Sequence, residues 1–225
     1  MPADLALDTV YRDARIRISE LAAGLTDEEL ATALPACPEW TAHDVVAHVT
    51  GVAVDSVNGR LDGMPGPTWT ARQVTERKGK PVPDILDEWA QAGPTVEAGL
   101  AARKINYRIV FDILTHEGDL REGLGRPPSQ GWLAILNFLA TQAVRAVKGT
   151  GTLLLHVDGE TFRGGEGEPV TEVRVDPYEL FRGLGSRRSR RQMRAWDWTG
   201  DPTPYLESLP FLGPRDDDQP GGEPR

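Results

Sequence analysis

Residues 107–127, YRIVFDILTHEGDLREGLGRP, decide the fold of the first half of the chain. Four apolar residues recur at the spacing of one helix face and predict a buried stripe: Ile105, Ile109, Ile113 and Leu120. Asp112 and His116 fall on the same stripe, one turn apart. A carboxylate buried without a partner costs on the order of several kcal/mol, so these side chains need a partner: each other, a third side chain or a metal. The predicted helix ends at Gly123-Leu124-Gly125, just before Pro127.

His48 is a second polar residue on a predicted apolar face. Thr41-Ala-His-Asp44 is a capping-box pattern that begins a helix. The inward residues of this helix are Val45, Val49 and Val52. Together with Asp112 and His116, His48 would offer two imidazoles and one carboxylate to a divalent metal and leave a coordination position open, as in catalytic zinc sites. The alternative is a buried polar network without a metal.

Asp119 and Cys37 each allow two interpretations. Asp119 follows His116 by one turn and can orient its ring as an outer-shell acceptor, or it can pair in solvent near Arg121. Cys37 precedes a predicted helix N-terminus, where a thiolate nucleophile would be favoured, or it is a small buried apolar group. His43 and His156 receive no role, because neither shows an evident partner in the sequence.

Residues 1–127 are predicted to form a helical bundle. The first helix follows a regular amphipathic rhythm through Leu7, Val10, Tyr11, Ala14, Ile18, Leu21 and Leu25. Residues 59–83 are rich in Gly and Pro and predict a long surface loop. A third long helix follows, kinked near Gly93-Pro94. With the helices that carry His48 and His116, this gives four amphipathic helices and no strand alternation.

Residues 128–213 predict a small α+β unit, and residues 214–225 a disordered tail. Trp132–Val147 is an apolar helix, and Thr152–Val157 and Val170–Val175 resemble short strands joined by a Gly-rich hairpin loop. Pro177 begins a further helix. The tail has no core-forming residue from Arg215 onward.

Composition excludes several classes of function. The net charge of −9 argues against a general nucleic-acid binder and against a binder of anionic membranes, since both need a basic surface. No apolar run reaches the roughly 20 residues that span a bilayer. The N-terminus lacks the apolar region of a signal peptide, and the single cysteine excludes an internal disulfide. We therefore expect a cytoplasmic protein.

A basic cluster stands out in this acidic chain, beside Trp196 and Trp198. It consists of Arg187, Arg188, Arg190, Arg191 and Arg194. Such a cluster suits a carboxylate or phosphate on a ligand, and the alternative is a solvated helix face that compensates acidic residues elsewhere. The sequence contains no P-loop, GxGxxG, GxSxG or CxxC motif, so nucleotide binding and serine-hydrolase chemistry have no support.

The chain resembles the mycothiol-dependent maleylpyruvate isomerase family. The resemblance rests on residues 37–51, CPEWTAHDVVAHVTG, on Asp112-x3-His116-x2-Asp119-Leu-Arg with Leu124-Gly125, and on Arg194-Ala-Trp-x-Trp-x-Gly-Asp-Pro. It implies a DinB-like four-helix bundle that carries a metal, usually zinc, followed by a small sterol-carrier-like α+β domain. It also implies that His48, Asp112 and His116 are the metal ligands. The family pattern has Glu at the position of Asp112.

The resemblance further implies a mechanism and partners. Mycothiol would bind as a low-molecular-weight thiol cosubstrate, and its thiolate would add to a small-molecule electrophile. Elimination after bond rotation gives cis–trans isomerisation of the maleylpyruvate type, whereas a stable adduct makes the enzyme a thiol S-transferase. Arginines of the second domain would hold substrate carboxylates, with Arg182, Arg187 and Arg188 as candidates. The alternative function is a non-catalytic binding protein for an acidic ligand or partner.

Overall fold

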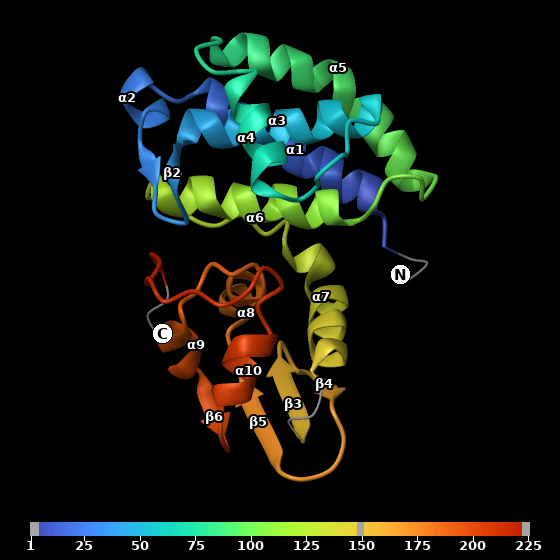
Figure 1. Cartoon of the computed structure of the whole chain (residues 1–225), viewed down its shortest axis with the longest axis vertical. Coiled ribbons are helices and arrows are strands. Elements are labelled where there is room, and N and C mark those ends of the chain that lie inside the picture. Colours follow the sequence, from blue (N-terminus) through green and yellow to red (C-terminus); the bar gives the residue numbers. More distant parts are fainter. Residues whose placement is uncertain (1–4, 148–150, 222–225) are drawn as a thin grey trace. The chain divides into compact units, whose positions relative to one another are not determined.

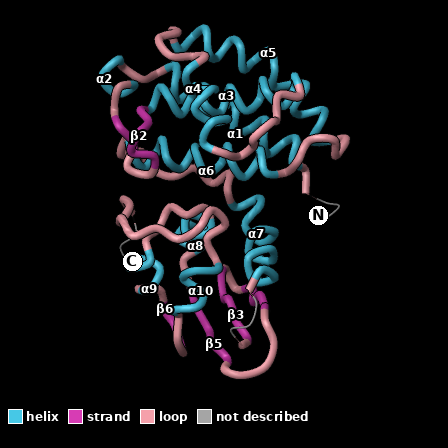
Figure 2. The backbone as a smooth tube through the Cα atoms, viewed as in Figure 1, coloured by secondary structure: helices cyan, strands magenta, loops and turns pink. Residues whose placement is uncertain are grey.

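The computed structural model of the chain describes residues 5–147 and 151–221 and divides into two compact units between Gly131 and Trp132 (Figures 1 and 2). The elements of the first unit are α1 (Leu7–Ala23), α2 (Asp27–Leu30), β1 (Ala33–Leu34), β2 (Cys37–Thr41), α3 (Ala42–Asn58), α4 (Pro67–Thr75), α5 (Val82–Ala101) and α6 (Arg108–Gly123). The elements of the second unit are α7 (Leu133–Ala146), β3 (Thr152–Val157), β4 (Glu160–Gly164), β5 (Val170–Arg174), α8 (Pro177–Leu184), α9 (Arg190–Arg194), β6 (Asp197–Thr199) and α10 (Thr203–Ser208).

Four helices, α1, α3, α5 and α6, pack into the bundle of the first unit (Figure 1). Helix α1 contacts α5 and α6, and α3 contacts the same two helices. The capping box predicted at Thr41 is present at the start of α3, and Thr26 forms another at the start of α2. Each hydroxyl accepts from the third residue of its helix. In the core, the Trp89 indole donates to the buried hydroxyl of Tyr11, and burial raises the pKa of that phenol well above its usual range.

Helix α4 lies in the segment that the sequence predicted as a loop. Pro67 is at its first turn, where the missing N–H costs nothing, and Trp69 and Gln73 are its buried residues. The helix packs closely on α3 at Gly51, where an added Cβ would lie 2.5 Å from Gln73 Cβ. A glycine inside a helix is about 1 kcal/mol less favourable than alanine, and this close approach is the reason for it here.

A buried carboxylate on α3, that of Asp55, also holds this segment. It accepts from Arg72 Nη2 and Gln73 Nε2 at 2.9 Å each and pairs with Arg60 Nη2 at 2.7 Å, while its own side chain is 0% exposed. The Trp69 indole donates to the carbonyl of Arg60 at 2.9 Å. The segment after α3 is therefore fixed by buried charge as well as by apolar packing.

The second unit has a four-stranded sheet in the order β4-β3-β5-β6. Strands β3 and β5 are parallel, and the other two neighbouring pairs are antiparallel. Helix α7 packs on β3 and β4. Strand β4 lies in the predicted hairpin loop, because Asp158 and Gly159 both take positive φ and close a tight turn straight after β3. The predicted combination of a helical bundle with a small α+β unit is confirmed.

Residues 214–221 are the described part of the tail for which the sequence predicted disorder, and they are hydrogen-bonded to α9. The backbone N–H of Arg190 donates to the carbonyl of Arg215, and Gln192 exchanges two hydrogen bonds with the backbone of Gln219. Gln219 is buried. Polar contacts thus hold a segment that has no core-forming side chain. The prediction of disorder rested on hydrophobic residues alone, so it did not include such contacts.

Candidate metal centre

Helices α3 and α6 bring the three predicted ligands together. His48 Nε2 lies 3.6 Å from one oxygen of Asp112, and His116 Nε2 lies 3.7 Å from the other. The ligand atoms of all three residues lie within 4.8 Å of one another. Both histidines are buried, whereas the Asp112 side chain is 35% exposed. The carboxylate therefore lies at the more open side of the group.

These separations suit a metal better than direct hydrogen bonds. Hydrogen bonds from nitrogen to oxygen rarely exceed about 3.2 Å, so the imidazoles are too far from Asp112 for strong ones. Two ligands about 2.1 Å from a tetrahedral zinc ion are separated by about 3.4 Å, close to the spacing seen here. In addition, His48 Nδ1 is buried without a hydrogen-bond partner among the described residues. A buried imidazole with so few polar contacts fits a ligand role at Nε2.

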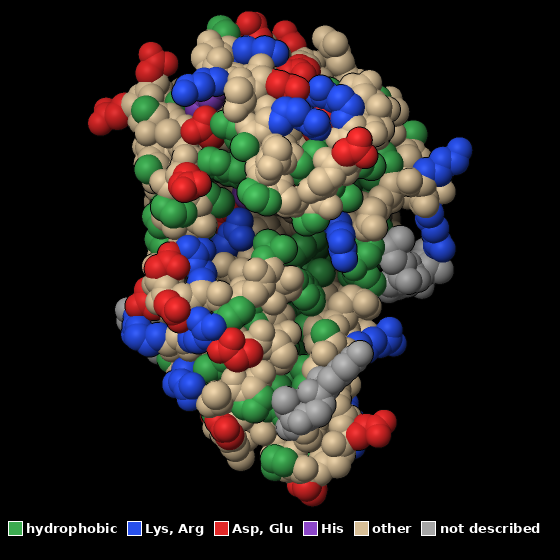
Figure 3. All heavy atoms as spheres, viewed as in Figure 1, with side chains coloured by type: hydrophobic (Ala, Val, Ile, Leu, Met, Phe, Trp, Pro, Cys, Tyr) green, Lys and Arg blue, Asp and Glu red, His purple; other side chains and the backbone are tan. Residues whose placement is uncertain are grey.

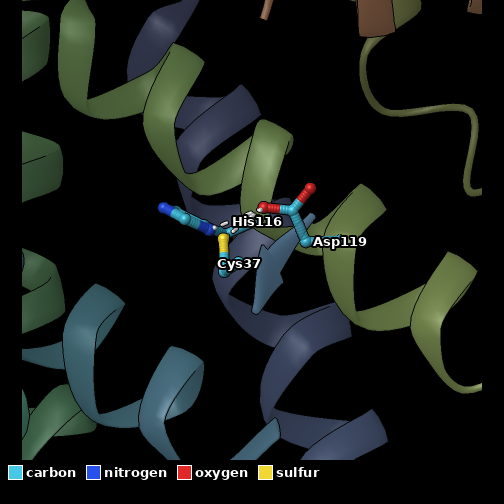
Figure 4. Close-up of side chains that lie close together, drawn as sticks. All are labelled: Cys37, His116 and Asp119. Atoms are coloured by element: carbon cyan, nitrogen blue, oxygen red, sulfur yellow. Dashed lines mark hydrogen bonds and ion pairs between the residues drawn. The ribbon is translucent and has the colours of Figure 1, made fainter. Parts of the chain in front are cut away.

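Asp119 faces the other ring nitrogen of His116. Its Oδ2 lies 2.9 Å from His116 Nδ1, and its side chain is 0% exposed, so the solvent-exposed alternative for this residue does not apply. The carboxylate favours the tautomer with its proton on Nδ1, and that tautomer leaves the lone pair of Nε2 on the side of Asp112. Cys37, from β2, donates its S–H to the same Oδ2 at 3.5 Å (Figure 4).

Two tryptophans that the sequence did not single out surround the histidines. The ring of Trp40, at the end of β2, is 4.8 Å from that of His48 and 6.0 Å from that of His116. Trp69, from α4, meets His48 edge-on at 6.4 Å. Trp40 is half-buried and Trp69 is buried. The pair excludes water from the imidazoles, which strengthens electrostatic interactions at the site.

A second buried carboxylate fixes α6 against α1. Glu117, which is 1% exposed, receives both arms of the Arg17 guanidinium at 2.9 and 2.8 Å and the Nε of Arg121 at 3.1 Å. The hydrogen bonds to Glu117 raise the pKa of Arg17 above its ordinary value. This network sets the rotation of α6, and hence the direction in which Asp112 and His116 point.

The arginines of the predicted substrate set belong to the second unit. Arg182 is buried on α8. Arg188 binds both carboxylate oxygens of Glu179, at 2.7 and 2.9 Å, and Arg187 donates to the carbonyl of Gly185. This two-point ion pair with Glu179 holds the Arg188 guanidinium inside the second unit.

The rest of the basic cluster is largely neutralised. Arg190 pairs with Glu207 and Asp216, and Arg191 pairs with Asp218. Pairing with Arg190 lowers the pKa of Glu207. On the face drawn in Figure 3, basic and acidic side chains lie side by side. These contacts favour the compensated surface over the anion-binding interpretation for Arg190 and Arg191.

The two histidines without an assigned role have partners in the structure. His43 Nε2 lies 2.9 Å from the carbonyl of Lys80. His156, for which the sequence suggested no acidic partner, lies 3.4 Å from Glu172 of the neighbouring parallel strand and 2.9 Å from the Thr161 hydroxyl. Strand pairing creates both contacts, and neither histidine lies in a potential metal-binding group among the described residues.

Comparison with known families identifies the first unit. Residues 11–106 match the mycothiol maleylpyruvate isomerase N-terminal domain. The first unit is therefore similar to the N-terminal domain of that family over most of its length. The match includes Cys37, Trp40 and His48 and ends before α6, so Asp112 and His116 lie beyond it.

Solved structures extend the likeness to most of the chain. Two crystal structures of the mycothiol-dependent maleylpyruvate isomerase, one of them of a histidine-to-alanine mutant, share 15% and 14% sequence identity with this chain. Each superposes with a TM-score of 0.56 over 83% of this chain and 90% of its own. At this identity the likeness concerns the fold. No curated protein matches the sequence. Among the described residues, no helix is long and apolar enough to cross a membrane.

Proposed function

We propose that this protein is a metal-dependent enzyme that activates a low-molecular-weight thiol, mycothiol in the first instance, for addition to a small electrophile. The observation that supports this most directly is that His48 from α3 and Asp112 and His116 from α6 lie close together. Helix α3 belongs to the part of the chain that matches the mycothiol maleylpyruvate isomerase N-terminal domain. The donor set of two imidazoles and one carboxylate favours zinc.

Each residue has a defined part in this proposal. His48 and His116 would hold the ion through Nε2, and Asp112 would hold it through a carboxylate oxygen. The chemistry that a bound zinc supplies is stabilisation of a coordinated thiol as its thiolate. Asp119 keeps His116 in the tautomer with its lone pair on Nε2, and Trp40 and Trp69 shield the imidazoles from water.

The reaction would be cis–trans isomerisation of a maleylpyruvate-type substrate or S-transfer to another electrophile. For the carboxylate of such a substrate, the candidates remain Arg182, Arg187 and Arg188. A reduced thiol as cosubstrate agrees with the expected cytoplasmic location. The pairing of Arg190 and Arg191 with acidic side chains weakens the alternative of a non-catalytic binder of acidic ligands.

Metal content tests the centre. Protein without a histidine tag would be dialysed, and its bound metal measured by elemental analysis. We expect about one equivalent of zinc per chain in the wild type and loss of it in His48→Ala and His116→Ala, each of which removes one ligand. His156→Ala is the matched control, because that histidine does not belong to the group of His48, Asp112 and His116. Full zinc content in either ligand variant would refute the assignment.

Product analysis then distinguishes the two reactions. Zinc-loaded protein would be incubated with mycothiol and maleylpyruvate, and the products separated by mass spectrometry. A trans isomer with unchanged thiol identifies an isomerase, while a mass increase equal to the thiol identifies a transferase. His116→Ala protein, treated with zinc in the same way and used at the same protein concentration, should form neither product above the rate of the thiol in buffer.

A further inference from the structure

We infer that Cys37 is a positioning residue for the metal centre and acts on it through Asp119. This inference rests on the proposed function, because it assumes that His116 binds a metal. Cys37 does not belong to the proposed ligand set of His48, Asp112 and His116. The inference gives this cysteine a role other than the nucleophile or the apolar filler that the sequence suggested.

The first step is that one carboxylate oxygen faces both side chains. Asp119 Oδ2 lies 2.9 Å from His116 Nδ1 and accepts the thiol of Cys37 at 3.5 Å. Figure 4 shows the three side chains together, with Cys37 coming from the strand and the other two from α6. Because the Asp119 side chain is fully buried, water does not compensate for a lost donor at this oxygen.

The second step is that Cys37 is itself held in place. Strand β2 pairs with β1 through Leu34 and Cys37, and at its other end the Thr41 hydroxyl caps α3. The backbone N–H of Ala42 donates to the carbonyl of Thr32 and ties the hairpin to the start of α3. The same short strand also carries Trp40. The thiol therefore reaches Asp119 from a supported element and limits where the carboxylate can rotate.

The third step concerns the strength of this contact. The thiol of Cys37 donates to Asp119 Oδ2 at 3.5 Å, and a thiol is a weak donor. A weak S–H donor contributes little energy by itself, but it selects one orientation of the carboxylate that orients His116.

Zinc affinity of the whole protein tests the inference, measured by competition with a chromophoric chelator. Cys37→Ala removes the donor and should weaken zinc binding about tenfold, the lower end of the effect of losing an outer-shell partner. Cys37→Ser keeps an O–H donor and should recover most of that loss. The thermal unfolding midpoint of each metal-free variant should stay close to that of the wild type, which separates positioning from packing.

A double-mutant cycle with Asp119→Asn gives the decisive result. If Cys37 acts through Asp119, Cys37→Ala should cause little further loss of zinc affinity when Asp119 is already replaced. Wild-type affinity in Cys37→Ala, equal losses in the Ala and Ser variants, or additive losses in the cycle would each overturn the inference. Failure of the wild-type protein to bind zinc would instead refute the proposed function, so the two failures are distinguishable.

Discussion

Asp112 lies between the two imidazoles, with one carboxylate oxygen facing each ring. Asp112→Asn keeps the shape of this side chain and removes its charge. We expect zinc affinity to fall at least about 100-fold, because loss of a charged ligand should cost no less than loss of an outer-shell partner. Chelator competition measures the change.

The matched variant is Asp112→Glu, which restores the carboxylate on the longer arm of the family pattern. Zinc binding should be retained in this variant, since α6 exposes this position and leaves room for the extra methylene. Equal affinities for the wild type and Asp112→Asn would show that Asp112 is not a ligand.

At the residue scale, the sequence predicted which side chains share a helix face, but not which side chains a strand places beside them. Asp112, His116 and Asp119 follow from helical spacing, and the capping box at Thr41 sets the position of His48. Trp40 and Cys37 reach the histidines only because β2 folds back against α6 and α3. No local periodicity in the sequence reports that placement.

The element that most affects the surroundings of His48 is α4. Asp55→Asn removes the charge that Arg60, Arg72 and Gln73 share and leaves buried donors poorly paired. We expect a loss of about 3 kcal/mol in the free energy of unfolding, measured by urea denaturation.

Glu76→Gln is the control for that change. Glu76 also pairs with Arg60, but its side chain is 36% exposed, so the substitution should cost under about 1 kcal/mol. If both variants lost the same stability, the burial of Asp55 would not be what makes its ion pairs important.

At the scale of helices and strands, the elements with a regular apolar pattern were predicted and those without one were missed. The long amphipathic helices α1, α3, α5 and α6 are evident from the sequence, since burial of one face imposes a regular pattern. Helix α4 and strand β4 were hidden in Gly- and Pro-rich stretches. In both cases a residue type that usually ends regular structure lies at the start of an element. Pro67 is the first residue of α4, and Gly159 closes the turn directly before β4.

On the scale of the whole molecule, zinc should stabilise one unit selectively. All proposed ligands lie in residues 5–131, and ligand at 100 times its Kd stabilises the state that binds it by about 2.7 kcal/mol. Hydrogen exchange with and without zinc should therefore show increased protection of α3 and α6, with little change in β3–β5. His116→Ala should show no zinc-dependent protection, and an equal gain in both units would contradict a site confined to the first.

The division of the chain between Gly131 and Trp132 also has an evolutionary consequence. Every side chain of the proposed centre, including Asp119 and its partner Cys37, is encoded on one side of that point. Recombination at this boundary would transfer the proposed metal centre intact to a different second module. Descendants of such an event would inherit the same arrangement of side chains, while the module that follows could be selected for another task.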